Sequence, residues 1–475
     1  MKILITHSYF LHFDAKEAET GKPYPPLAPL ALAAWLERDL DAEVVVYDVM
    51  FDRTVDGAVA AVAHHRPDVL IFYDDDFNFL TKMCLRNMRD AVFAILETIE
   101  RPPLIIAHGS DASDQADDYL ARGVDVVAHR NAEKTLLALL RAWAEERGPS
   151  AWDELDGISW RRGTEVVRRP QIRTNLPLDA APAPAWDKID LDPYRRMWRE
   201  RHGAFSLNVS TSHGCPYRCN WCAKPLYGRT YKAHDPVRAA REFVYLHREL
   251  GADWLWVTDD IFALKPGWID AFADELARLG TTVPYKCQNR ADLITESLAA
   301  GLARSGCREV WLGVESGSQK ILDAMDKDET VETIRTATAR LKTHGIEVGF
   351  FLQYGYLGED YDDIRKTLRL VRECLPEHIG VSVSYPLKDT PFYDTVAAQL
   401  GEKRNWDDSG DLALMYEGTY PPDFYRALHR YTHHYFGFVS LFRPQPLRKR
   451  LRRLAAQYRH LPGMIKYKRM MNACR

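Results

Sequence analysis

Short apolar runs and segments with helical spacing alternate along the first 147 residues. Each run has the length of a strand, and each is followed by apolar positions three or four residues apart, as on one face of a helix. The runs are 3–5, 44–46, 69–72, 104–106 and 124–127. Five such units predict a doubly wound parallel sheet over residues 1–147. Ligands of such sheets lie beyond the carboxyl ends of the strands, so the loops there are candidate binding segments.

A second α/β series follows a connector. Residues 148–204 contain a predicted small hairpin and a stretch that excludes a long helix because of its prolines; it includes Pro177, Pro182, Pro184 and Trp186. From residue 205 to about 395, six strand patterns alternate with helical segments, at 205–209, 254–258, 283–288, 310–314, 348–353 and 381–385. Residues 396–475 have helical spacing and many aromatic residues, which we expect to form ordinary core.

Composition narrows the class of protein. A chain of 475 residues that is 46% hydrophobic can fill two or three cores. A net charge of −4 gives no argument for a nucleic-acid partner. The start, 1–6, is a short apolar run that we expect to be a strand and not a signal peptide, and no run approaches the ~18–20 residues that span a bilayer. Eight cysteines in a chain of this length do not form a disulfide framework, so we expect a reducing cytoplasm.

Three of those cysteines share one short segment at the spacing CxxxCxxC. They are Cys215, Cys219 and Cys222, with the aromatic Trp221 before the last of them. Three thiolates from one tight loop can hold three irons of a [4Fe–4S] cluster and leave the fourth iron for a small molecule to chelate. The alternative is structural zinc, with His213 as the fourth ligand. Zinc ligands usually come in two separated pairs, and no second pair is visible.

The run TSHGCPYRCNWC over 211–222 resembles the core of the radical S-adenosylmethionine superfamily. Later residues, among them the run 311–322, narrow the resemblance to the branch with an N-terminal cobalamin-binding domain. That branch includes radical C-methyltransferases and the anaerobic cyclase of magnesium-protoporphyrin monomethyl ester. The resemblance implies a cobalamin-binding-like domain over 1–147, a connector over 148–204, a partial (β/α)6 barrel over 205–395 and a helical C-terminal domain over 396–475.

The resemblance also implies where S-adenosylmethionine binds. Active residues of such barrels lie at the carboxyl ends of the strands, and the candidates are Trp221, Asp259, Asp260, Glu315, Ser316, Tyr354 and Gly355. Asp259 or Asp260 would accept hydrogen bonds from the ammonium, Glu315 and Ser316 would reach the ribose or carboxylate, and Gly355 would let the backbone approach the adenine. Arg290 could pair with a carboxylate. The alternative for an acid at a strand end is a helix cap.

For cobalamin, the candidates are Pro26, Asp75, Gly109, Ser110 and Glu133. The family often has Gly-Glu-Gly-Glu after the fifth strand of this domain, whereas this chain has Arg-Asn-Ala-Glu over 130–133, so both glycines are missing. The Asp-x-His-x-x-Gly signature, whose histidine binds cobalt in other cobalamin proteins, is also absent. The alternative is a sheet domain that only supports the barrel. The acids 74–76 form either a solvated loop end or hydrogen bonds with corrin amides.

These observations favour a radical S-adenosylmethionine enzyme that methylates an unactivated carbon with the help of cobalamin. A radical oxidative cyclase or rearrangement enzyme is the second hypothesis, and a non-catalytic iron–sulfur or zinc protein is the third. We expect a small-molecule substrate and a reductant such as flavodoxin or ferredoxin. The end of the chain, from Arg448, is basic, with no acid after Asp423. It could touch an anionic membrane surface, although a solvated basic tail is the expectation.

Overall fold

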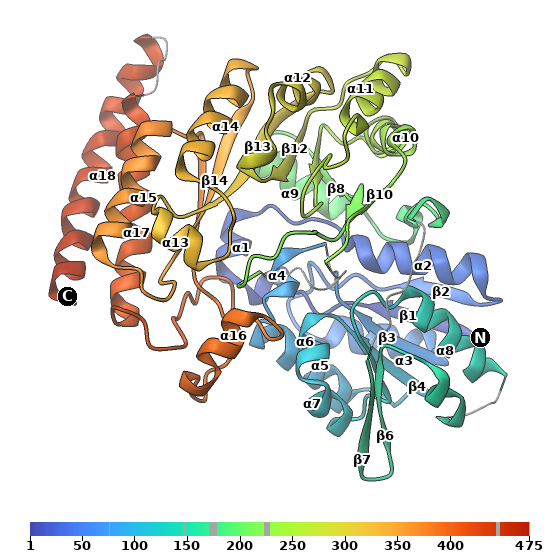
Figure 1. Cartoon of the computed structure of the whole chain (residues 1–475). Helices are drawn as coiled ribbons and strands as arrows, with labels where there is room; N and C mark the ends of the chain where they lie inside the picture. Colours follow the sequence, from blue (N-terminus) through green and yellow to red (C-terminus); the bar gives the residue numbers. More distant parts are fainter. Residues whose placement is uncertain (76, 146–148, 171–177, 223–228, 443–446, 475) are drawn as a thin grey trace.

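The computed structural model describes residues 1–75, 77–145, 149–170, 178–222, 229–442 and 447–474 (Figure 1). Two parallel sheets lie within it, as the alternating patterns predict. One belongs to the N-terminal part and the other to the central part, and the helices of the C-terminal part cover one side of the second sheet. The predicted α/β class is thereby confirmed. Pro177 of the proline-rich stretch lies outside the described residues.

The first sheet has the strand order β2-β1-β3-β4-β5-β6-β7. Its parallel strands are β1 (Lys2–Thr6), β2 (Glu43–Val46), β3 (Val69–Tyr73), β4 (Leu104–His108) and β5 (Val126–Ala128). The predicted hairpin is β6 (Ile158–Arg162) and β7 (Glu165–Arg169), and it joins the sheet by antiparallel pairing with β5. The sheet therefore continues past residue 147.

Helices cover both faces of this sheet because its strands are apolar on both sides. Ile3 and Ile5 belong to the core under α2 and α8, whereas Leu4 belongs to the core under α3, α5 and α7. The helices are α1 (Ala15–Thr20), α2 (Leu27–Asp39), α3 (Asp56–His65), α4 (Phe79–Lys82), α5 (Arg86–Thr98), α6 (Ser110–Asp114), α7 (Ala116–Ala121) and α8 (Glu133–Ala144). This is the doubly wound arrangement that the sequence predicts.

The second sheet contains six parallel strands in the order β15-β14-β13-β12-β11-β8. They are β8 (Ser206–Val209), β11 (Trp254–Val257), β12 (Tyr285–Asn289), β13 (Cys307–Glu315), β14 (Glu347–Tyr354) and β15 (His378–Val383). The helices between them are α10 (Pro236–Arg248), α11 (Trp268–Arg278), α12 (Glu296–Arg304), α13 (Gln319–Ala324), α14 (Val331–Thr343) and α15 (Tyr361–Cys374). Val310, Leu312 and Val314 are fully buried, while Glu309 and Trp311, at the alternate positions of the strand, are half-buried. The sheet thus buries one face under helices and turns the other toward the barrel interior.

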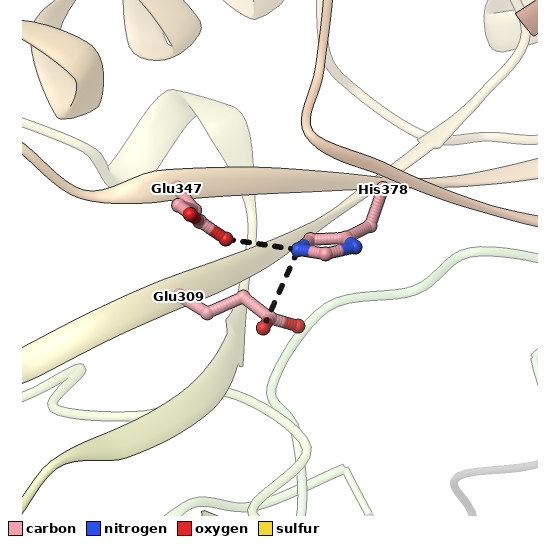
Figure 2. A group of neighbouring side chains, drawn as sticks. All are labelled: Glu309, Glu347 and His378. Carbon is pink, nitrogen blue, oxygen red and sulfur yellow. Dashed lines mark hydrogen bonds and ion pairs between the residues drawn. The ribbon is translucent and has the colours of Figure 1, made fainter. Parts of the chain in front are cut away.

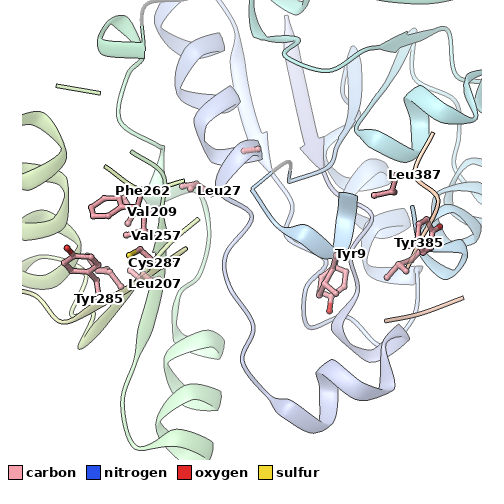
Figure 3. Close-up of a cluster of buried hydrophobic side chains, with 14 of the residues drawn as sticks. Tyr9, Leu27, Leu207, Val209, Val257, Phe262, Tyr285, Cys287, Tyr385 and Leu387 are labelled. Carbon is pink, nitrogen blue, oxygen red and sulfur yellow. The ribbon is translucent and has the colours of Figure 1, made fainter. Parts of the chain in front are cut away.

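A common hydrophobic core joins the two sheets. Figure 3 shows Leu27, at the start of α2, in the same cluster as Leu207 and Val209 of the barrel strand β8. The segment before α2 is also held by hydrogen bonds: Trp198 Nε1 of α9 (Asp192–His202) donates to the carbonyl oxygen of Pro23 at 2.7 Å, and Asn208 Nδ2 donates to that of Pro25 at 2.9 Å. The barrel and the sheet domain are therefore packed together.

The C-terminal helices form an outer layer. α16 (Pro391–Val396) follows the last barrel strand, α17 (Pro422–Val439) packs against β15 and α15, and α18 (Leu447–Ala473) packs against α17 (Figure 1). Two glycines let α17 and α18 approach closely. A Cβ on Gly437 would lie 2.5 Å from the His460 ring, and one on Gly463 would lie 2.4 Å from the His434 ring.

Candidate active site

The three cysteines of the CxxxCxxC motif lie in one loop at the carboxyl end of β8. A short antiparallel pair, β9 (Ser212–His213) with β10 (Lys232–Ala233), closes the base of this loop. Cys215, Cys219 and Cys222 are all half-buried. Metal can therefore reach the thiols from solvent, and a metal centre bound to them would lie next to the barrel.

Asn220 fastens the cysteine loop to other segments of the chain, residues 324–326 and Tyr356. Its backbone N–H donates to the carbonyl oxygen of Met325 at 3.1 Å, and its side-chain amide donates to Ala324 and to Asp326, each at 2.9 Å. The Tyr356 hydroxyl donates to Asn220 Oδ1 at 2.8 Å. Sequence reasoning did not single out Asn220, because its partners are more than 100 residues away in the chain.

Arg290, at the end of β12, places a positive charge beside the cluster loop. Its guanidinium lies 3.8 Å from the centroid of the Tyr217 ring, and Nη1 lies 3.7 Å from Cys219 Sγ. Asp292 holds this guanidinium from two sides, at 2.9 Å from Nε and 3.2 Å from Nη2. The bidentate carboxylate expected for Arg290 is therefore Asp292.

A buried lysine adds a second charge. Lys327 is 5% exposed, and its Nζ lies 3.6 Å from a carboxylate oxygen of both Glu315 and Glu329. Burial opposes the charged form, but the two carboxylates raise the pKa of Lys327. Glu315 ends β13 with a left-handed backbone, φ +59°, and the adjacent Ser316 is fully buried. Of the predicted residues, Glu315 thus lies in the charged network beside the cluster loop.

Asp259 and Asp260, after β11, differ in their surroundings. Asp259 is buried and accepts hydrogen bonds from Thr211 N at 2.6 Å, Thr211 Oγ1 at 2.5 Å and Ser212 Oγ at 2.7 Å. Burial raises the pKa of Asp259 to about 6. Asp260 forms an ion pair with Lys82 of the sheet domain at 3.6 Å. Asp259 therefore anchors the residues that lead into the cysteine loop, and its role toward an ammonium group stays a prediction.

We expect Asp259→Ala to destabilise the protein and to lower its iron content. The substitution leaves three buried donors of Thr211 and Ser212 without their acceptor, which costs about 2–4 kcal/mol of unfolding free energy. Urea unfolding and iron analysis measure both effects. Asp260→Ala is the control, since it removes one ion pair and should cost less. If Asp259→Ala were as stable as the natural protein but bound S-adenosylmethionine more weakly, Asp259 would instead be the acceptor for the ammonium group.

The loop after β14 is held by a buried glutamate. Gly355 has φ +84° and donates its N–H to Glu359 Oε2 at 2.6 Å. Within the described part of the chain, Glu359 Oε1 has no hydrogen-bond partner, and burial raises the pKa of Glu359 from 4.5 to about 8. The neighbouring Tyr354 side chain is buried, and its hydroxyl accepts from Thr432 of α17 at 3.2 Å. The backbone N–H of Gly355 is thus bonded to Glu359 and its carbonyl oxygen accepts from the Tyr416 hydroxyl, so its approach to an adenine stays a prediction, whereas the Tyr354 hydroxyl contacts the helical layer.

Glu359→Gln is expected to remove a pH dependence of stability. The folded protein keeps the Glu359 proton up to about pH 8, while the unfolded chain releases it near its ordinary pKa of 4.5. Unfolding free energy therefore falls as pH rises between these values. At pH 8.5 the glutamine variant should be more stable than the natural protein by at least about 1 kcal/mol, and at pH 5.5 the gap should shrink. Thermal melts at both pH values test this, with the exposed Glu402→Gln as the control. An equal difference in stability between Glu359→Gln and the natural protein at both pH values would contradict the prediction.

At the carboxyl edge of the first sheet, the predicted cobalamin residues serve partly as structural supports. Pro26 precedes α2, and Asp75 accepts from the backbone N–H of Leu27 at 3.3 Å and of Ala28 at 3.2 Å. Asp74 and Asp75 are both 5% exposed, so the interpretation as a solvated loop end is wrong for these two; Asp76 lies outside the described residues. Burial raises the pKa of Asp75 to about 6. Asp75 therefore caps α2.

The other three candidates surround the loop where the family's glycines are missing. Gly109 has φ +125° and Ser110 begins α6, while Glu133 begins α8. Arg130, despite its side chain, has φ +53°. It therefore adopts the left-handed conformation that glycine favours, at a cost of roughly 1–2 kcal/mol. The loop thus has the left-handed backbone conformation at residue 130 that a glycine would adopt without this cost.

Loops of the two sheets meet across this edge. Arg130 Nη2 pairs with Asp389 Oδ2, after β15, at 2.7 Å, and the Phe77 and His213 rings are 5.1 Å apart. Among the described residues, Tyr9 Oη and Asn208 Oδ1 near this junction are buried without a hydrogen-bond partner. Such atoms can form hydrogen bonds with the amide groups that surround a corrin ring. The residues present therefore fit cobalamin between the domains.

A second polar cluster lies at the opposite, amino-terminal end of the barrel strands (Figure 2). His378 Nε2 is 3.0 Å from Glu347 and 3.6 Å from Glu309, on three neighbouring strands. Next to it, Trp311 stacks on Phe351 at 4.6 Å, and a Cβ on Gly349 would lie 2.4 Å from the Trp311 ring. Sequence reasoning missed this cluster because its members are 31 to 69 residues apart. It is separate from the cysteine loop.

Comparison with known proteins identifies the class. Residues 209–371 match the family model described as the radical SAM superfamily. This region of the chain is therefore a radical SAM domain, and the cysteine loop and the strands β11, β12, β13 and β14 fall within the matched residues.

Particular relatives narrow the branch. An uncharacterized methyltransferase of Pyrococcus horikoshii, PH0819, is 25% identical over 289 residues, 60% of either chain. The anaerobic magnesium-protoporphyrin IX monomethyl ester cyclase of Rubrivivax gelatinosus is 22% identical over 85% of this chain and 70% of its own. The alignment thus spans less than two thirds of the first relative.

Solved structures share the fold over most of the chain. The cobalamin-dependent S-adenosylmethionine radical enzyme OxsB, with aqua-cobalamin bound, is similar over 98% of this chain and 72% of its own, with a TM-score of 0.73 and 15% identity. The radical S-adenosylmethionine methyltransferase TsrM of Kitasatospora setae is similar over 84% of this chain and 75% of its own, with a TM-score of 0.66 and 18% identity. At these identities the likeness shows the fold, with the sheet domain and barrel together.

Proposed function

We propose that this protein is a radical S-adenosylmethionine enzyme that transfers a methyl group to an unactivated carbon of a small molecule. The observation that carries the proposal is the cysteine loop, set at the carboxyl edge of the barrel and facing the carboxyl edge of the sheet domain. When bound, a reduced [4Fe–4S] cluster with S-adenosylmethionine on its open iron supplies a 5′-deoxyadenosyl radical, and cobalamin supplies the methyl group. The protein contributes position and the exclusion of water.

Residues of this chain have separate tasks in the proposal. Cys215, Cys219 and Cys222 hold the cluster, and Arg290 and Lys327 place two cations beside it. Trp221, Asp260, Glu315, Ser316 and the backbone at Gly355 are the proposed contacts of S-adenosylmethionine. Asp259 and Asn220 keep the loop in place through their hydrogen bonds. A small reductant such as flavodoxin or ferredoxin delivers the electron in a cytoplasmic setting.

Cobalamin occupies the junction of the two domains in this proposal. OxsB, whose fold matches over 98% of this chain, has aqua-cobalamin bound. The unpartnered atoms of Tyr9 and Asn208, and the glycine-like turn at Arg130, support a corresponding site here. A histidine signature is absent, so we propose binding without histidine coordination. Pro26, Gly109, Ser110 and Glu133 line the sheet-domain edge of that site.

A radical oxidative cyclase is the second candidate. The Rubrivivax gelatinosus relative with that name aligns over 85% of this chain, including the sheet domain. Both candidates share the first step, cleavage of S-adenosylmethionine. Anaerobically reconstituted protein, reduced chemically and given S-adenosylmethionine, should release 5′-deoxyadenosine. Iron-loaded protein that releases none would overturn both candidates.

A zinc protein is the third candidate, and the geometry gives it less support. Sulfurs on one tetrahedral zinc lie about 3.8 Å apart, given a Zn–S bond of about 2.3 Å. Among the described residues, the group that brings three ligand atoms within 4.8 Å of one another is Glu309, Glu347 and His378, and it includes no cysteine. His213 lies on β9, before the cysteine loop, and is half-buried. Within the described residues, the three cysteine sulfurs therefore do not form such a group.

A further inference from the structure

We propose that α18 binds the surface of an anionic lipid bilayer and so brings the enzyme to a membrane. The described chain has no helix with the length and hydropathy to span a bilayer. The proposed contact is therefore peripheral, with the helix lying along the lipid headgroups. It goes beyond the proposed chemistry and does not depend on it.

The charge of α18 has one sign. Its 27 residues include nine basic residues and no aspartate or glutamate; the basic ones are Arg448, Lys449, Arg450, Arg452, Arg453, Arg459, Lys466, Lys468 and Arg469. The whole chain has a net charge of −4, so the positive charge of this helix is local. Basic segments of this density are attracted to anionic lipid headgroups, at about 1 kcal/mol for each residue near the surface.

Apolar side chains of α18 remain exposed between these charges. Leu461 and Ile465, one turn apart, are each 48% exposed; Met470, on the other side of the helix, is 44% exposed. They make up three of the six large hydrophobic side chains with the highest exposure among the described residues. Leu461, Pro462, Ile465, Lys466 and Arg469 line one surface hollow.

The apolar face of α18 is distinct from the face that packs on α17. His460 and Gly463 face α17 through the glycine–histidine contacts, and Met471 is fully buried. α18 forms the outer edge of the molecule, on the side of α17 away from the barrel (Figure 1). The exposed leucine and isoleucine are therefore left over after the helix has packed.

An anionic membrane explains both features together. A second copy of α18 would cover the apolar residues but would bring nine positive charges against nine more. A nucleic acid would neutralise the charges but gives leucine and isoleucine no apolar surface along its backbone. A helix with apolar residues on one face and lysine and arginine around it is typical of peripheral membrane binding.

Vesicle sedimentation of the full-length protein tests this proposal. The natural protein should bind vesicles of 70% phosphatidylcholine and 30% phosphatidylglycerol, should bind pure phosphatidylcholine weakly, and should lose affinity at 0.5 M NaCl. Lys466→Glu/Arg469→Glu should weaken binding to the anionic vesicles at least about tenfold. Leu461→Gln/Ile465→Gln should weaken it similarly at low salt. The control is Arg53→Glu/Arg161→Glu, two exposed arginines of the sheet domain, which should bind as the natural protein does.

Three outcomes would overturn the proposal. The first is equal binding to both vesicle types, or none to either. The second is a dimer in light scattering that Leu461→Gln/Ile465→Gln dissolves, which would assign the face to a second copy. The third is binding to duplex DNA, in the absence of vesicle binding, that survives the same apolar substitutions. Thermal melts of each variant confirm that a loss of binding is not a loss of folding.

Discussion

Replacing Cys219 with alanine is expected to abolish the iron–sulfur cluster and all cleavage of S-adenosylmethionine. The natural protein, reconstituted without oxygen, should hold about four irons per chain. Three thiolates are the minimum for a cluster with one open iron, and Cys219 is the thiol beside the Arg290 guanidinium. Iron and sulfide analysis, and chromatography of 5′-deoxyadenosine, measure the two losses. Cys215→Ala and Cys222→Ala should behave in the same way.

Cys374→Ala is the matched control, since Cys374 is a half-buried free thiol at the end of α15, outside the loop. This variant should keep its iron and its activity. Full iron and activity in Cys219→Ala would remove the loop from the site. One zinc and no iron in the natural protein would favour the zinc protein instead.

The natural protein is expected to retain about one hydroxocobalamin per chain after desalting, with a spectrum that shows no histidine ligand. Ser110→Trp should reduce retention at least about tenfold, because the ring adds bulk at the sheet edge where the corrin is proposed to lie. Glu100→Trp is the control, at an exposed position before β4 and thus at the opposite edge of the sheet. Absorbance of the desalted protein is the measurement.

Absence of corrin absorbance in the natural protein would contradict the methyltransferase proposal and leave the first domain as a support for the barrel. A point substitution is a sharper test than deletion of residues 1–147. The β6–β7 hairpin pairs with β5, and Leu27 shares a core with β8, so deletion would expose both.

Local patterns were enough to predict both sheets. Runs such as 69–72 and 310–314 are apolar because their strands are buried, and the spacing of the cysteine motif is itself local. Contacts between distant segments could not be predicted in this way. Asp75 caps α2 from 47 residues away, and Tyr356 reaches Asn220 across 136 residues. A sequence pattern shows that an acid follows a strand but not which donors will surround it.

Arg130 illustrates a different limit. The missing glycine suggested a lost approach of the backbone to a ligand, yet the structure keeps the left-handed turn, φ +53°, with an arginine whose guanidinium pairs with Asp389. Residue type gives a cost for a backbone conformation, and that cost can be offset by contacts elsewhere in the fold. The ion pair joins the sheet domain to the barrel, which local reasoning about residues 130–133 had no means to detect.

The products of S-adenosylmethionine test the central claim most directly. Reduced protein loaded with cluster and cobalamin, incubated with S-adenosylmethionine, should form both S-adenosylhomocysteine, from methyl transfer, and 5′-deoxyadenosine, from radical cleavage. S-adenosylhomocysteine should disappear when cobalamin is left out, and 5′-deoxyadenosine should disappear when the cluster is left out. Formation of 5′-deoxyadenosine with no S-adenosylhomocysteine, in protein that holds cobalamin, would contradict radical methylation and favour the cyclase.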